Sequence, residues 1–240
     1  MKVDPRFLIQ DGSEVFTGNE LLIKGALEAE GGTHLLTGYP GSPVAGFFDA
    51  MELVAPLFKE KGIRASIANN AALGAAMLNG SQKGALRGIC AMKSVGLHVA
   101  TDALALGNLA GAHPQGGVLV IVGDDPWSDS TQVPADSRYL SKHIYMPVME
   151  PATNQELKDW IDLGFKLSRE ANLYIGYLVT TNQADGGGSV KCRPNHYPEQ
   201  NAVNKFTIDT AHIDLENTVL LPPRTWKREA AFPARFAKLW

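Results

Sequence analysis

Six short apolar segments alternate with helical patterns along most of this chain, and that alternation limits the folds open to it. We expect strands at residues 34–37, 63–68, 86–91, 118–122, 146–149 and 173–180. Segments 118–122 and 173–179 lack the buried–exposed alternation that is typical of a sheet with one face in water. The sequence therefore predicts an α/β fold, a six-stranded parallel sheet with helices on both faces.

Helical patterns fill the stretches between these strands. We expect helices at residues 17–30, 44–59, 70–82, 97–109 and 154–170. The first begins at Thr17 and has Glu20 three residues later, which is the pattern of a capping box. Residues 124–135 are polar and predict a loop.

The composition changes at residue 184. Residues 184–201 are rich in glycine, proline and polar side chains, as is typical of a linker or surface arm. Residues 225–240 have apolar residues near helical spacing, interrupted by Pro233. We therefore predict an α/β domain over residues 1–183, with an extended arm and a C-terminal segment over residues 184–240. We expect the arm to wrap onto a partner.

Overall composition is that of an ordinary globular protein, with 240 residues, 45% hydrophobic, 20% charged and a net charge of -3. It excludes a disordered chain and a broadly basic nucleic-acid-binding protein. The longest apolar runs are far shorter than the roughly 18 residues of a membrane span. Asp4, Asp11 and Glu14 interrupt any secretory signal, and Cys90 and Cys192 form no CxxC pair. We expect a cytoplasmic protein that binds neither nucleic acid nor membrane.

Polar or glycine-rich loops follow most of the expected strands, at residues 39–43, 69–70, 92–96, 124–132 and 180–183. In a parallel sheet, ligands bind outside the carboxyl ends of the strands, so these are the candidate binding loops. The sequence has no GxxxxGKS/T, no GxGxxG after a strand, no GxSxG and no HExxH. It therefore gives no motif for a P-loop, a Rossmann-type nicotinamide site, an α/β-hydrolase or a zincin.

Single residues add candidates of unequal strength. A cation at Lys93, directly after a strand, suits an anionic ligand, although a solvated surface lysine has the same sequence position. Asp124 and Asp125 can bind a metal, but the favoured interpretation is a turn in which their carboxylates accept hydrogen bonds from backbone amides. His98 lies on an apolar helix and is expected in the core or at an interface. Trp127, in a polar loop, is a candidate lid or interface anchor.

Three longer segments carry a resemblance to a known family. They are TGYPGSP at residues 37–43, MKSVGLHVATDAL at 92–104 and GGVLVIVGDDPWSDSTQVPADSRY at 116–139. These resemble the 2-oxoacid:ferredoxin oxidoreductase family, with the strongest likeness to the large subunit of indolepyruvate ferredoxin oxidoreductase. MPVMEP at 146–151 and LLPPRTWKR at 220–228 extend the likeness, which is collinear over most of residues 15–230.

The resemblance implies the pyrimidine-binding domain of a thiamine-diphosphate enzyme. The family's diphosphate and Mg²⁺ motif, GDG…N, and its ferredoxin-like cysteines are absent from this sequence. We therefore expect no metal ligand here, and we expect Mg²⁺ and iron–sulfur clusters on partner chains. The implied partners are a subunit with the diphosphate-binding domain, an iron–sulfur subunit, ferredoxin or a similar acceptor, a 2-oxoacid and coenzyme A.

Two loops match the parts of the family that face the cofactor. One is similar to the loop over cofactor and substrate, and comprises Tyr39, Pro40, Gly41, Ser42 and Pro43. The other is similar to the loop that faces the aminopyrimidine and the substrate, and comprises Lys93, Ser94, Val95 and Gly96.

The sequence departs from the family at Asn69, or at Asn70 if the alignment shifts by one residue. The family has a glutamate there, and its carboxylate hydrogen-bonds the aminopyrimidine nitrogen and promotes proton removal from the thiazolium carbon. An amide forms a hydrogen bond but cannot carry that proton. Two hypotheses therefore remain: a catalytic subunit that oxidatively decarboxylates an aryl or branched 2-oxoacid to an acyl-CoA, or a degenerate structural or regulatory subunit.

Overall fold

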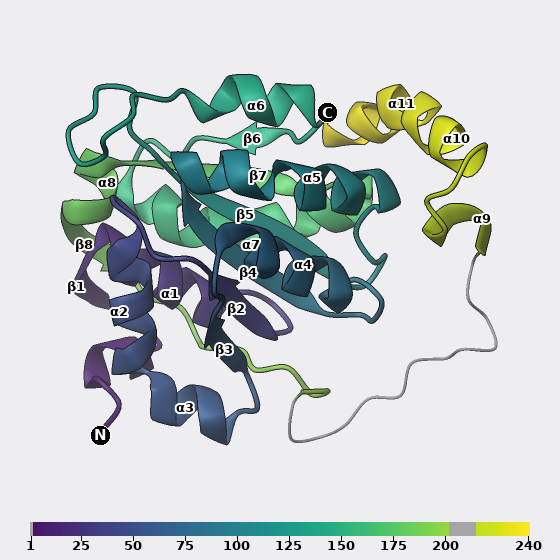
Figure 1. The fold of residues 1–240 in the computed structure, drawn as a ribbon. Helices are drawn as coiled ribbons and strands as arrows, with labels where there is room; N and C mark the ends of the chain where they lie inside the picture. The colour runs from purple at the N-terminus through teal and green to yellow at the C-terminus, as the bar shows by residue number, and fades with distance from the viewer. Residues whose placement is uncertain (1, 202–214) are drawn as a thin grey trace.

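A six-stranded parallel sheet forms the centre of the computed structural model, which describes residues 2–201 and 215–240 (Figure 1). The strands follow the spatial order β3-β2-β4-β5-β7-β6, and each neighbouring pair is parallel. Their bounds are β2 Leu35–Gly38, β3 Arg64–Ile67, β4 Arg87–Lys93, β5 Gly117–Asp124, β6 Val148–Met149 and β7 Ile175–Thr180. The predicted six-stranded parallel sheet is confirmed.

Helices cover both faces of this sheet, as the unbroken apolar strands predict. The helices of this region are α1 Gly18–Glu28, α2 Ala45–Leu53, α3 Ala55–Glu60, α4 Ala71–Ser81, α5 Ser94–Ala110, α6 Ser137–His143 and α7 Asn154–Ala171. Strand β5 shows the division. Leu119 and Ile121 belong to the core beneath α1, α2 and α7, whereas Val118, Val120 and Val122 belong to the core beneath α4 and α5.

Two helical predictions differ in detail from the structure. The helix expected at residues 44–59 is two helices, α2 and α3, which meet at Val54. Pro56 lies in the first turn of α3, where a missing N–H costs no helical hydrogen bond. In the interior of one continuous helix, the same proline would remove a hydrogen bond and break the helix. Helix α6 has no counterpart in the prediction, because the side-chain pattern around it is polar.

The glycine-rich segment after residue 184 is not a linker at its start. Residues Gly187–Lys191 form β8, which pairs antiparallel with β1, Ser13–Thr17, after a short helix α8 at Thr181–Asp185. Val190 and Cys192 are buried in the core of α1 and α7, and His196 N donates to Leu27 O at 2.7 Å. The start of the segment therefore packs on its own domain, because β1 supplies a strand edge that local composition does not reveal, and the expected contact with a partner stays a prediction. The proposed division at residue 183 stays a prediction.

The C-terminal segment forms short helices, α9 Leu215–Thr218, α10 Arg224–Ala230 and α11 Phe232–Phe236, drawn in yellow in Figure 1. The predicted interruption is confirmed, since Pro233 lies in the first turn of α11. Phe232 is buried in the main core and stacks on Tyr145 with ring centroids 4.4 Å apart. The N-terminal part of the arm, residues 187–201, and this segment are separated by residues 202–214, which lie outside the described ranges.

Candidate functional site

Strand order creates a switch point between β2 and β4. The chain passes from β2 outward to β3, then crosses back to place β4 on the other side of β2. At such a point the loops leaving the two strands diverge, and open α/β sheets bind ligands in the resulting crevice. The loops at residues 39–43 and 93–96 leave β2 and β4, so the structure brings these two candidate segments together at the carboxyl edge.

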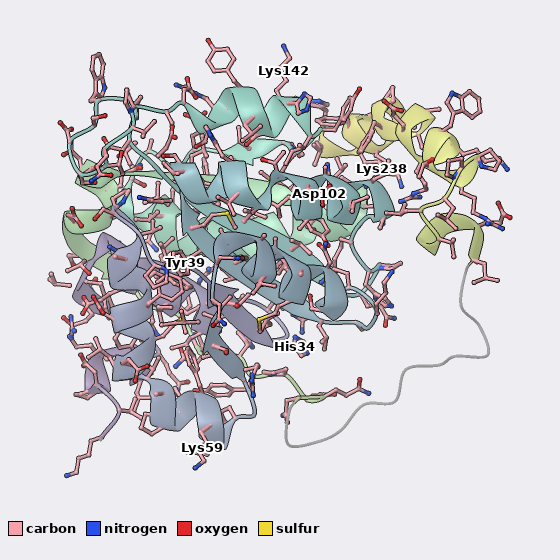
Figure 2. The ribbon with its side chains drawn as sticks, in the orientation of Figure 1. His34, Tyr39, Lys59, Asp102, Lys142 and Lys238 are labelled. Carbon is pink, nitrogen blue, oxygen red and sulfur yellow. The ribbon has the colours of Figure 1, made fainter. Side chains whose placement is uncertain are left out.

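Close backbone contacts fix the loop of residues 39–43 against β4. Tyr39 N donates to Ala91 O at 3.0 Å, and a Cβ at Gly41 would lie 2.7 Å from Lys93 Cδ. Tyr39 is 45% exposed beside this contact (Figure 2). Pro40 and Gly41 are half-buried, Ser42 is exposed and Pro43 is buried. The loop therefore presents Tyr39 and Ser42 to the surface and uses Gly41 to admit the stem of Lys93.

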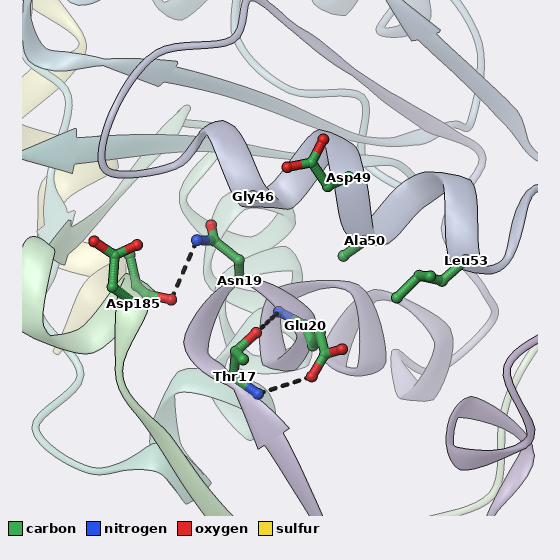
Figure 3. A pocket seen from close by; sticks show the side chains of 9 residues that line it. Thr17, Asn19, Glu20, Gly46, Asp49, Ala50, Leu53 and Asp185 are labelled. Carbon is green, nitrogen blue, oxygen red and sulfur yellow. Dashed lines mark hydrogen bonds between the residues drawn. The ribbon is translucent and has the colours of Figure 1, made fainter.

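Asn19 holds this loop from behind and was missed by the sequence analysis. Its side chain is 5% exposed, and its Nδ2 donates to Pro43 O at 3.2 Å and to Ala184 O at 3.1 Å. Asn19 lines a pocket between α1, α2 and α8, which Figure 3 shows from close by. The volume of this pocket is about 310 Å³. The Thr17–Glu20 capping box marked the start of α1, but nothing in the local sequence links Asn19 to a loop far along the chain.

The two asparagines after β3 have different roles. Asn70 is the N-cap of α4, and its Oδ1 accepts a hydrogen bond from Leu73 N at 2.8 Å. Asn69 is exposed, and its side chain makes no hydrogen bond within the described ranges. The helix therefore already uses the amide of Asn70, whereas the amide of Asn69 is available to a ligand.

Strand β4 passes directly into α5, so the predicted loop at residues 92–96 is wrong. Lys93 ends the strand and is also the N-cap of α5, and Ser94 is its first helical residue. Gly96 permits the tight junction, because a Cβ there would lie 3.0 Å from Met92 Cβ and 3.3 Å from Ala71 Cβ. The candidate residues lie at the start of a 17-residue helix rather than on a loop.

This helix start has several unused polar groups. Among the residues that the structure describes, no side chain caps α5, and Lys93 has no hydrogen bond or ion pair. Ser94 is fully buried, yet its Oγ has no hydrogen-bond partner within the same ranges. The Lys93 ammonium and the positive end of the α5 dipole are unfavourable neighbours, but each of them attracts an anion. The arrangement can bind a carboxylate or another anionic group.

The Asp124 and Asp125 carboxylates cap backbone amides, as the favoured interpretation predicted. Asp125 accepts hydrogen bonds from the backbone N–H groups of residues 129, 130 and 131 at 2.8 to 2.9 Å. Asp124 Oδ1 accepts from Ser137 N at 3.0 Å and from Ser137 Oγ at 2.7 Å, and burial raises the pKa of Asp124. Residues 2–201 and 215–240 hold no cluster of His, Cys, Asp and Glu suited to a metal ion.

His98 and Trp127 both lie on the surface. His98 is exposed on α5, so the core interpretation is wrong and the interface interpretation stays a prediction. Trp127 is 84% exposed in the loop after β5. Across the described ranges, no helix combines the length and apolar character that crossing a bilayer requires.

Comparison with known proteins gives relatives in sequence and in structure. No protein-family model matches the sequence. The chain is 32% identical over 173 residues to indolepyruvate oxidoreductase subunit IorA of Pyrococcus horikoshii, which covers 72% of this chain and 26% of the relative. It is 33% identical over 189 residues to the subunit of the same name from Archaeoglobus fulgidus, which covers 75% and 29%.

A solved structure is similar to the whole described fold. It is the 2-oxoglutarate:ferredoxin oxidoreductase from Magnetococcus marinus with 2-oxoglutarate, coenzyme A and succinyl-CoA bound. The TM-score is 0.65 at 15% identity, over 96% of this chain and 45% of that chain. At this identity the likeness concerns the fold alone.

The parallel sheet with its switch point defines a doubly wound α/β domain. The sequence relatives specify which kind: the chain belongs to the 2-oxoacid:ferredoxin oxidoreductase family. It matches about a quarter of the length of the IorA relatives, 26% and 29% in the two cases above.

Proposed function

We propose that this chain is the pyrimidine-binding subunit of a thiamine-diphosphate-dependent 2-oxoacid:ferredoxin oxidoreductase. The reaction is the oxidative decarboxylation of an aryl or branched 2-oxoacid to an acyl-CoA, with the electrons passed to ferredoxin or a similar acceptor. The observation that carries this proposal is the uncapped start of α5 at the switch point, where Ser94 Oγ and Lys93 lack partners within the described residues. The names of the IorA relatives support an aryl substrate.

The residues at the carboxyl edge fit half of such a cofactor site. The buried, unpartnered Ser94 hydroxyl is a polar group that a ligand can satisfy, and Gly41 and Gly96 leave room for close approach. The residues that would hold the pyrimidine half are Tyr39, Pro40, Gly41, Ser42, Pro43, Asn69, Ser94, Val95 and Gly96. Thiamine diphosphate, when bound, supplies the nucleophilic carbon and the electron sink that decarboxylation needs.

Each polar residue has a defined task under this proposal. Asn69 donates or accepts a hydrogen bond at the aminopyrimidine and orients it, but it cannot carry a proton. Lys93 pairs with the carboxylate of the 2-oxoacid. Ser94 contributes a buried hydroxyl, and a hydrogen bond is stronger in such an environment than in water.

Partner chains complete the enzyme under the same proposal. A second subunit supplies the diphosphate-binding domain with its Mg²⁺, and an iron–sulfur subunit carries the electrons, because this sequence lacks the motifs for both. The assembly works in the cytoplasm.

A second candidate function rests on Asn69 alone. If no other group moves the proton, the chain is a structural or regulatory subunit that keeps the shape of the site without its chemistry. Glu52 and Glu60 are no substitutes, since they belong to α2 and α3 rather than to the segment after β3.

Cofactor titration tests the proposal. The chain is titrated with thiamine diphosphate and Mg²⁺ by calorimetry, alone and after copurification with chains that carry GDG…N and CxxC motifs. We expect heat of binding only in the assembled complex. A complex that contains such chains and still binds no thiamine diphosphate at this chain's edge contradicts the proposal.

Asn69→Glu separates the two functions. In the cofactor-loaded complex, this change is expected to raise proton exchange at the thiazolium carbon by about 10²–10⁴, with little change in cofactor affinity. Deuterium loss followed by NMR measures the rate. Asn70→Glu is the matched control, because it removes the α4 cap and should not raise the exchange. An unchanged rate in Asn69→Glu shows that another group does this work.

A further inference from the structure

The pocket between α1, α2 and α8 has an acidic lining and lies behind the loop of residues 39–43. Glu20, Asp49 and Asp185 belong to its walls, whereas no lysine, arginine or histidine among the described residues does. Its volume of about 310 Å³ is that of a site for a small organic group. The pocket therefore combines negative charge with room for a ligand.

Only one of the three carboxylates in this pocket is compensated by the chain itself. Arg6 Nη2 lies 2.6 Å from Glu20 Oε1, and Thr17 N donates to Glu20 Oε2 at 2.9 Å. Asp49 and Asp185 are exposed, and neither makes a hydrogen bond or ion pair with any residue of the ranges 2–201 and 215–240. Asp185 also ends α8, at the negative end of the helix dipole, where a carboxylate is unfavourable without a cation nearby.

Asn19 adds a buried acceptor that has no donor. Its Nδ2 donates to Pro43 O and Ala184 O, and these two carbonyl groups fix the orientation of the amide because they can only accept. Asn19 is 5% exposed, yet no group in the described part of the chain donates to its Oδ1, which is rare for a buried acceptor. In Figure 3 the amide extends from α1 toward α2, between Asp185 and Asp49. The pocket therefore calls for a ligand that donates hydrogen bonds.

We propose that this pocket, the α1–α2–α8 pocket, binds an aliphatic cation, which is an alkyl chain that ends in a guanidinium or ammonium group. Such a group supplies the positive charge that Asp49 and Asp185 lack, and it only donates hydrogen bonds, as Asn19 Oδ1 requires. Ala50 and Leu53 form an apolar part of the wall, on which the alkyl chain packs. The proposal is independent of the thiamine chemistry, because none of these residues is assigned to the cofactor.

A metal ion fits the same pocket less well. Across the residues that the structure describes, no three His, Cys, Asp or Glu side chains are grouped so that they could hold one. A calcium ion takes roughly six or more oxygen ligands at short range, whereas this pocket offers two free carboxylates and one amide oxygen on three separate helices. A guanidinium group has five N–H donors spread over a plane, so it can reach acceptors on several walls.

Occupation of the pocket has a consequence for the loop of residues 39–43. The amide of Asn19 connects the two, since its Nδ2 holds Pro43 O and its Oδ1 is the acceptor offered to the cation. A donor bound to Oδ1 polarises the amide and strengthens the hydrogen bonds that Nδ2 donates. The bound cation therefore makes the loop more rigid and regulates the carboxyl edge from behind.

Calorimetric titration of the full chain with butylguanidinium tests the proposal, and butylurea is the matched neutral ligand. We expect saturable binding of one butylguanidinium and at least about tenfold weaker binding of butylurea. Asp49→Asn and Asp185→Asn should each weaken binding about three- to fivefold, as expected for exposed carboxylates, and together about tenfold or more. Both changes preserve side-chain shape at exposed positions. Asp102→Asn, at an exposed position on α5, is the control and should bind like the parent chain.

Amide hydrogen exchange tests the link to the loop. Saturating butylguanidinium should slow exchange at Tyr39, Gly41 and Ser42 but not in β8, and unchanged exchange at saturation overturns the link. Equal affinity for butylguanidinium and butylurea, no saturable binding, or affinity unaffected by both aspartate changes overturns the site. Displacement of the ligand by equimolar Mg²⁺ or K⁺ also overturns it, in favour of a metal ion.

The same titration in the assembled complex identifies the source of the cation. Retained binding of butylguanidinium means that a free small molecule occupies the pocket. Loss of binding in the complex means that a basic side chain of a partner chain fills it.

Discussion

The two ends of helix α5 differ in how completely their polar groups are satisfied. At its C-terminal end, Arg235 and Arg228 donate to the last carbonyls of the helix, including Asn108 O at 2.6 Å and Ala110 O at 2.7 Å. At its N-terminal end, within the described residues, no side chain caps the helix and buried Ser94 Oγ has no partner. The chain itself therefore satisfies the carbonyl groups at the C-terminal end of α5, whereas the polar groups at its N-terminal end are available to a ligand.

The same contrast holds for the whole sheet. At the amino edge, Arg87 Nε donates to Gly32 O at 2.6 Å, and His34 Nδ1 accepts from Arg87 N at 3.1 Å. At the carboxyl edge, Asn69 and Lys93 make no side-chain hydrogen bond in the part of the chain described. Beside them, the Ser94 hydroxyl is buried and unpaired in the same ranges, and because buried polar groups are normally paired, this edge is the candidate for ligand binding.

Lys93→Ala gives the largest expected effect at the open edge. In the assembled complex, removing this cation should weaken binding of a 2-oxoacid by about 2–5 kcal/mol, because a desolvated carboxylate loses its partner. Calorimetry with a 2-oxoacid and with an uncharged analogue measures the difference. Lys83→Ala, an exposed lysine at the far edge, is the control. Equal losses of affinity for the 2-oxoacid and the uncharged analogue would show that the substitution disorders the start of α5 rather than removing a charge pair.

Arg235→Ala tests the closed end. Arg235 is 5% exposed and donates to the carbonyls of Asn108, Leu109 and Asn172. Its loss should lower the free energy of unfolding by about 3 kcal/mol, because it leaves the helix carbonyls unpaired. Urea denaturation measures this. Substitution of the exposed Lys238, which Figure 2 labels, by alanine should change stability by less than about 0.5 kcal/mol. Equal free energies of unfolding for Arg235→Ala and Lys238→Ala would contradict the role of Arg235 at the C-terminal end of α5.

His34 makes the amino edge sensitive to acid. Burial, with the nearby Arg87 charge, lowers the pKa of His34 from 6.5 to about 4. Between these pH values the unfolded chain binds a proton that the folded chain does not. The free energy of unfolding should therefore fall by up to about 3 kcal/mol as the pH drops from 6.5 to 4. Urea titrations at several pH values measure the slope, which His34→Gln should reduce and His143→Gln should not.

A pair of buried serines gives the smallest and most closely matched test. Ser168, at the amino edge, accepts from Val118 N at 2.9 Å and donates to Leu173 O at 2.6 Å. Ser168→Ala should lower the free energy of unfolding by about 1–3 kcal/mol. Ser94→Ala should instead raise it by about 1 kcal/mol, because it removes a buried hydroxyl that has no partner. Destabilisation of similar size in both variants would mean that the two edges do not differ.

The position of the candidate site could be predicted from the sequence, since the segments that follow parallel strands meet at one edge of the sheet. Tyr39–Pro43 and Lys93–Gly96 were chosen on that ground, and the structure brings them together. The sequence could not show that Asn70 is used as a helix cap while Asn69 is not, because both are asparagines after a strand. It also missed Asn19, whose partners lie on loops distant in the chain.

By itself, the sequence determined the alternation of strands and helices, the apolar character of both sheet faces and the break at Pro233, whereas the break before Pro56 was missed. These depend on residues close together in the chain, through side-chain periodicity and the fixed backbone of proline. Only the tertiary structure decided the strand order with its switch point, the pairing of β1 with β8 and the groups left unpaired at one edge. Each of these joins segments far apart in the chain, and a polar group is satisfied or unsatisfied only by what the completed fold places beside it.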